Sequence, residues 1–125
     1  MQTVEIPREA WAQRLNEFTA IHEGWLVSLD VLASEIGAQP AIRDLPLLAV
    51  SADRIDQDGT IAVSVAGSAT EHFTHIIPAV TRIDVARTDD GADAALQIES
   101  ADGTRTILRF RAAVLPELVD GIVRQ

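Results

Sequence analysis

The sequence contains no cysteine, no lysine and no tyrosine. Without cysteine there is no thiol nucleophile, no thiolate metal site and no iron–sulfur cluster. Without lysine there is no Schiff base and no phosphate-loop lysine, and without tyrosine there is no phenolic acid. These absences exclude many activities, and they favour a protein that is not an enzyme.

Positive charge is scarce as well. The chain has 10 basic side chains, all of them arginine, against 19 acidic ones, so the formal net charge is −9. Such a chain repels phosphate backbones and anionic lipids, and we expect neither a nucleic acid nor a membrane partner. No apolar run approaches the ~20 residues that span a bilayer. The start of the chain, acidic and containing a proline, is unlike a signal peptide, so we expect a cytoplasmic protein.

Length and composition indicate one globular domain, residues 1–125. A chain of 125 residues has the size of a typical domain, and 47% of these residues are hydrophobic. The sequence has no internal repeat, no low-complexity tract and no linker, so we place no domain boundary. We predict no cofactor and no metal ion.

The N-terminal part is predicted to form a helix over residues 7–23. Pro7 suits the first helical position, where its missing N–H would be unpaired anyway. Gly24 is a suitable helix end. An amphipathic helix packed on a sheet is the expected interpretation, and a helix that binds a partner is the alternative. The apolar stripe that supports both recurs at helical spacing in Trp11, Leu15, Phe18 and His22.

From Gly24 onward the apolar residues alternate with period two, which is typical of strands. Residues 33–46 contain a glycine and two prolines, and we expect a loop with at most one helical turn. The C-terminal segment LPELVDGIV is expected to form a short helix. The predicted strands cover residues 24–33, 45–55, 60–66, 71–77, 81–87, 92–100 and 104–111.

Short Asp-Gly turns between these strands favour hairpins over crossover connections. The predicted fold is therefore α+β. It is a mostly antiparallel meander of six or seven strands, forming a curved sheet or a half-open small barrel. The N-terminal helix 7–23 packs on this sheet, and a short C-terminal helix follows.

One strand register follows from the turn that joins the last two strands. If Ala101-Asp102-Gly103 is a three-residue loop with its glycine in the left-handed region, Leu96 lies opposite Leu108. A four-residue loop over 89–92 places Ile83 opposite Ile98 and Val85 opposite Leu96. On the other face, the same pairing aligns Arg82, Glu99 and Arg105 in one row. We interpret this row as a solvent-side charge ladder, and an anion site is the alternative.

Residues 71–75 read EHFTH, with His72 and His75 three positions apart. Two such histidines share a face on a helix, but on a strand they point to opposite faces. Phe73 and the following isoleucines favour a strand. We therefore expect one core-side, hydrogen-bonded histidine and one surface histidine, without knowing which is which. A metal or acid–base role is the alternative.

The motifs IPREAW, GWLVSLDVL, LPL, EHFTHIIP, TRIDV and SADGTRTILRFR run in this order along nearly the whole chain. In these motifs the chain resembles a family of small bacterial proteins classed as a domain of unknown function. The resemblance implies a stand-alone bacterial protein, and it carries over no catalytic or binding residue. The segment IIPAVTRIDV is also similar to a strand pair of PRC-barrel domains, small β-barrels used for protein contacts.

Three functions remain open. The first is a non-enzymatic binding or assembly module that forms a homo-oligomer or binds a protein partner. The second is a small-ligand carrier, with Trp25, Phe73, Phe110 and His75 lining a cavity between sheet and helix. The third is a hydrolase or isomerase that uses His72 or His75 with an acid. The candidate ligand-binding residues are His75, Phe73, Trp25, Arg82, Glu99 and Arg105; we name no catalytic residue.

Overall fold

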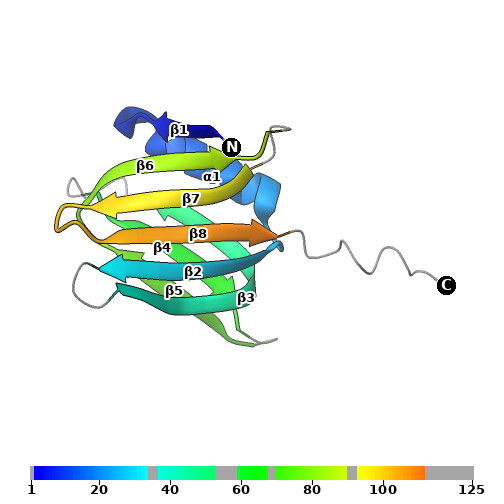
Figure 1. The fold of residues 1–125 in the computed structure, drawn as a ribbon. Helices are drawn as coiled ribbons and strands as arrows, with labels where there is room; N and C mark the ends of the chain where they lie inside the picture. Colours follow the sequence, from blue (N-terminus) through cyan, green and yellow to red (C-terminus); the bar gives the residue numbers. More distant parts are fainter. Residues whose placement is uncertain (1, 34–36, 53–58, 68–69, 90–92, 112–125) are drawn as a thin grey trace.

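The computed structural model describes residues 2–33, 37–52, 59–67, 70–89 and 93–111. Within these residues, eight antiparallel strands form one open sheet in the order β1-β6-β7-β8-β2-β3-β4-β5 (Figure 1). The strands are β1 Gln2–Ile6, β2 Leu26–Ala33, β3 Gly37–Ala52, β4 Ile61–Ala66, β5 His72–Ile77, β6 Val80–Arg87, β7 Asp93–Ser100 and β8 Arg105–Arg111.

Strand β3 belongs to two layers. Its first half pairs with β2, and its second half pairs with β4. Between the two halves the sheet folds over, so that β4 and β5 lie behind β8 and β2 (Figure 1). The inner faces of both layers then bury one apolar core, as strands with one apolar face require. Its fully buried members include Val27, Leu29, Leu47, Val50, Ile61, Val63, Val65, Ile83, Val85, Leu96, Ile98 and Leu108.

The N-terminal helical segment begins later than predicted. Pro7 precedes a short 3-10 helix, Arg8–Ala10, and the α-helix α1 spans Trp11–His22. The predicted stripe is confirmed, because all four of its members are buried. Gly24 follows the helix with φ +87°, a conformation that glycine adopts without strain.

Helix α1 covers one edge of the back layer. It packs on β3, and its Thr19 hydroxyl lies 3.0 Å from both the N–H and the carbonyl of Val50. A sheet edge with unpaired backbone N–H and C=O groups can pair with another chain, and a helix that covers the edge prevents this pairing. None of the helices in the described ranges is long and apolar enough to cross a membrane.

Two strand predictions were wrong. Strand β1 was missed, and residues 37–46 belong to β3 instead of a loop. Pro40 and Pro46 suggested a break, but both pair with β2, and Pro40 lies beside an irregular position of the ladder. Asp44 lies beside one irregularity with φ +50°, and its N–H bonds to the Ser28 hydroxyl at 3.1 Å. Such bulges let a strand accommodate proline, which cannot donate a ladder hydrogen bond.

The meander is also only partly correct. Strands β2 to β5 form one meander, and strands β6 to β8 form a second one. The two meanders are joined because β2 pairs with β8, and β1 pairs with the outer edge of β6. The predicted C-terminal helix lies outside the described residues, as does Asp58 of the predicted Asp58-Gly59 turn.

The predicted register is confirmed. Leu96 pairs with Leu108 in the β7–β8 hairpin, and Gly103 in its turn has φ +89°. In the β6–β7 pair, Ile83 lies opposite Ile98 and Val85 opposite Leu96. Apolar alternation on both strands and a turn of known length were enough to set this register.

Candidate functional site

Strand β5 places its two histidines on opposite faces of the sheet, as the strand interpretation predicted. His75 pairs with the fully buried Val63, so its imidazole lies on the inner face. His72 pairs with Ala66 on the outer face and is exposed. The two rings therefore cannot bind one ion together. In the described part of the chain, no cluster of three or more His, Cys, Asp or Glu side chains is placed to hold a metal.

A pocket of about 320 Å³ lies beside His75, between the end of β5 and the β7–β8 turn. We call it the His75 pocket. Its wall is mostly apolar, with Val31 and Ile77 among its members, and the hydroxyl residues Ser100 and Thr106 also line it. Burial lowers the pKa of His75, so the neutral imidazole predominates at pH 7.

The core-side histidine was expected to be hydrogen-bonded, and for His75 this stays a prediction. The buried and hydrogen-bonded histidine is His22, which is 1% exposed and whose Nδ1 donates to the Phe18 carbonyl at 2.9 Å. The helical spacing predicted that His22 is buried, but it gave no sign of its partners.

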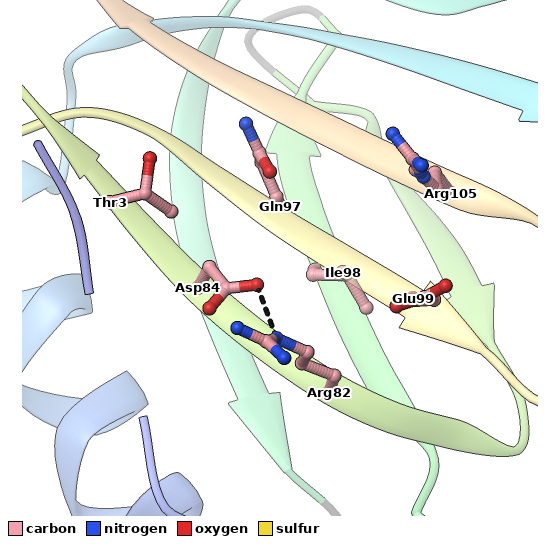
Figure 2. Close-up of a pocket in the computed structure, with 7 residues that line it drawn as sticks. All are labelled: Thr3, Arg82, Asp84, Gln97, Ile98, Glu99 and Arg105. Atoms are coloured by element: carbon pink, nitrogen blue, oxygen red, sulfur yellow. Dashed lines mark hydrogen bonds and ion pairs between the residues drawn. The ribbon is translucent and has the colours of Figure 1, made fainter. Parts of the chain in front are cut away.

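The three charged candidates line a groove on the outer face of β6, β7 and β8, with a volume of about 290 Å³ (Figure 2). We call it the Arg82 groove. Glu99 has Arg82 and Arg105 as its cross-strand neighbours, as the register predicted. The ion pairs of Arg82 are different ones, with Asp84 at 2.9 Å and Glu5 at 3.8 Å. The hydrogen bond and the charge of Asp84 raise the pKa of Arg82.

The sequence interpretation missed Asp84 as a member of this groove. Asp84 is 9% exposed, and its Oδ1 is buried without a hydrogen-bond partner among the described residues. Figure 2 shows Arg82 folded back over β6 toward Asp84. Their spacing of two residues on one strand, which puts both on one face, was the signal that could have found the pair. Two guanidinium groups and two carboxylates line the groove, so its charge is balanced.

Trp25 and Phe110 are not among the lining residues of the His75 pocket or of the Arg82 groove. Both rings pack against His22. The Trp25 ring meets the imidazole edge-on with 4.6 Å between centroids, and the Phe110 ring stacks on it at 4.6 Å. The exposed Phe73 is also absent from the lining of the His75 pocket. The predicted site residues thus lie in four places: the His75 pocket, the Arg82 groove, the surroundings of His22 and the exposed surface of β5 at Phe73.

Strand β5 also carries the largest exposed apolar side chains of the sheet. Phe73 is 53% exposed and Ile76 is 54% exposed. In the described part of the sheet β5 pairs only with β4, so its other edge is free. Apolar side chains beside a free strand edge are typical of surfaces that pair with another chain.

The fold and these sites define a class: a small α+β protein whose open antiparallel sheet carries an apolar pocket, a charged groove and a free edge. The chain belongs to a family of unknown function, DUF5335, whose model matches residues 2–117. It is similar to an uncharacterized protein of Aquifex aeolicus (strain VF5), with 31% identity over 118 residues, covering 94% of this chain and 100% of that protein. No solved structure matches the chain. The resemblance to a bacterial family of unknown function is thereby confirmed.

Proposed function

We propose that this protein is a non-enzymatic assembly module in which β5 pairs with β5 of a second copy. The observation that carries the proposal is the free edge of β5, with Phe73 and Ile76 more than half exposed beside it. Leaving such apolar surface in water is unfavourable, and pairing removes it.

The backbone direction of β5 supports this pairing. Gly67 donates to the Glu71 carbonyl at 3.0 Å, at the end of the β4–β5 ladder. In an antiparallel pair, hydrogen-bonded positions alternate, so the odd-numbered residues of β5 turn their N–H and C=O groups toward β4. The even-numbered residues His72, Thr74 and Ile76 therefore direct theirs toward the free edge.

A second copy fits this edge without further change. A two-fold axis at Thr74 sets His72 opposite Ile76 of the other copy, and all the outward N–H and C=O groups then find partners. On the inner face the same axis sets Phe73 of each copy opposite His75 of the other. In this register each exposed apolar side chain of β5 faces a side chain of the second copy.

The charges around β5 support the same partner. The described outer face of β3's second half, β4 and β5 consists of alanine, serine, threonine, leucine, isoleucine and His72, although the whole chain carries a net charge of −9. Two copies can thus approach along this face without bringing like charges together. The other free strand, β1, carries the charged Glu5, which discourages edge pairing.

The test is native mass spectrometry and sedimentation velocity at micromolar concentration on wild type, Thr74→Pro and Thr74→Val. Proline at position 74 removes an N–H that points to the free edge and leaves the β4 ladder intact. Valine keeps this N–H, and both variants lose the contact of the Thr74 hydroxyl with Ser64. We expect dimers for wild type and Thr74→Val and a folded monomer for Thr74→Pro. A monomeric wild type, or a Thr74→Pro dimer, would contradict the proposal.

A further inference from the structure

The His75 pocket carries a few polar side chains in a mostly apolar wall. Thr106 is 2% exposed and Ser100 is 8% exposed. Thr106 shares the inner face of the sheet with Leu108, Ser100 shares it with Ile98, and both line the pocket. A hydroxyl group and a neutral imidazole can each donate or accept a hydrogen bond from a ligand.

These groups converge from three parts of the chain. His75 reaches the pocket from β5 in the back layer, Thr106 from β8 in the front layer, and Ser100 from the end of β7. The rest of the wall is mostly apolar and includes Val31 and Ile77. An apolar pocket with a few convergent polar groups is the usual form of a small-molecule site.

We propose that the His75 pocket binds a small uncharged molecule, apolar over most of its surface and with one hydroxyl or carbonyl group at its end. The apolar wall buries the body of this ligand, and the hydroxyl groups of Ser100 and Thr106 and the imidazole of His75 pair with its polar end. The volume of about 320 Å³ exceeds the ~150 Å³ of a cavity that holds benzene, so a substituted single ring fits.

The charges at the pocket argue for an uncharged ligand. Among the described residues of its lining, the only charged side chain is Asp102, which already accepts a hydrogen bond from the Thr104 N–H at 2.9 Å. None of these lining residues is an arginine that could pair with an anion, and the net charge of −9 repels one. Neutral donors and acceptors match a hydroxyl or a carbonyl group.

The test is a titration of the full chain with p-cresol and with toluene, followed by amide chemical shifts in two-dimensional NMR. We expect p-cresol to give saturable shifts at His75 and in the Ser100–Thr106 segment. Thr106→Val replaces the hydroxyl by a methyl group of similar size. This variant should weaken p-cresol binding by about 3- to 10-fold, the effect of one hydrogen bond, and leave toluene binding within about twofold.

The matched control is Thr81→Val, which removes an exposed hydroxyl on β6 away from the pocket. If Thr106→Val does not fold, Ser100→Ala takes its place with the same expectation. The inference is overturned if p-cresol gives no saturable shifts at the pocket, or if Thr106→Val weakens p-cresol and toluene equally. His75 and Ile76 belong both to the pocket and to the proposed interface. Repeating the titration on the monomeric Thr74→Pro therefore shows whether the pocket binds p-cresol without the second copy.

Discussion

The imidazole of His22 stacks on the phenyl ring of Phe110, with 4.6 Å between ring centroids and 17° between ring planes. Phe18 also stacks on this imidazole at 4.9 Å, the two phenyl rings lie 5.6 Å from each other, and the Trp25 ring meets the imidazole edge-on. Since the Phe18 carbonyl can only accept, the bond at 2.9 Å places the hydrogen on Nδ1 of His22. The Nε2 atom lies 3.6 Å from the Asp93 carboxylate. His22 thus joins the end of α1 to β7, to β8 and to Trp25, the residue before β2.

Truncation of this ring should destabilise the protein. His22→Ala removes a fully buried ring with three aromatic neighbours, and we expect the free energy of unfolding to fall by about 3 kcal/mol. The control is His72→Ala, whose ring is exposed and whose effect should stay within ~0.5 kcal/mol. Urea unfolding followed by tryptophan fluorescence measures both. If the free energy of unfolding falls equally in the two variants, the aromatic cluster around His22 does not stabilise the fold.

Gly59 and Gly103 provide a matched pair for backbone strain. Both have positive φ, +82° and +89°, so alanine at either position is strained by about 1–2 kcal/mol. A Cβ at Gly59 would lie 2.7 Å from the Val80 carbonyl, whereas one at Gly103 meets nothing within 4 Å. We expect Gly59→Ala to lower the free energy of unfolding by about 1–3 kcal/mol more than Gly103→Ala. If the denaturant midpoints of the two variants coincide, the close contact of position 59 with the Val80 carbonyl is ruled out.

The lowered pKa of His75 predicts a loss of stability in acid. Since burial holds its pKa below the usual histidine value of 6.5 in the folded state, the unfolded chain binds the proton more readily. This contribution to stability is full above pH 6.5 and declines as the pH falls from there toward the lowered pKa. The pocket's one acidic residue, Asp102, has a lowered pKa through its bond to Thr104 and stays ionised in this range.

Urea unfolding at several pH values, compared between wild type and His75→Gln, measures this contribution. We expect a shallower pH dependence below pH 6.5 for His75→Gln, and an unchanged one for the control His72→Gln. A pH profile of His75→Gln that matches the wild-type profile would contradict the assignment.

The Thr19 hydroxyl is expected to stabilise the contact of helix and sheet. Thr19→Val leaves the N–H of Val50 without its partner in a half-buried position. We expect a loss of about 1–2 kcal/mol in the free energy of unfolding. The control Thr81→Val removes an exposed hydroxyl that bonds to the Glu99 carbonyl, and it should cost less than ~0.5 kcal/mol. Hydrogen exchange at Val50 gives a second readout, and unchanged protection in Thr19→Val would contradict the role of this hydroxyl.

The sequence predicted local pairings better than long-range ones. The β6–β7–β8 register followed from alternation and from the turn at Gly103, because hairpin partners are close along the chain. Residues 37–46 were misjudged because Pro40 and Pro46 resemble a loop, and only pairing with β2 makes them a strand. Tertiary contacts override local preference in such segments.

For the candidate sites, too, the sequence predicted local relationships better than contacts between distant segments. Alternation predicted that the two histidines of β5 face opposite ways, and the register brought Arg82, Glu99 and Arg105 together. The contacts of His22 with Phe110, and of His75 with the β7–β8 turn, join residues far apart along the chain. No local pattern reports on such contacts, because they depend on how the two layers face each other.

The pairing of β2 with β8 has a consequence for how the chain is made. Leu26 lies opposite Arg111, so β2, which is synthesised early, pairs with β8, which is synthesised late. On the ribosome, the N-terminal helix and β2 emerge long before β8 is synthesised, with their apolar faces uncovered. Contacts of such long sequence separation also slow folding in free solution. The newborn chain therefore exposes apolar surface of the front layer until β8 has been synthesised.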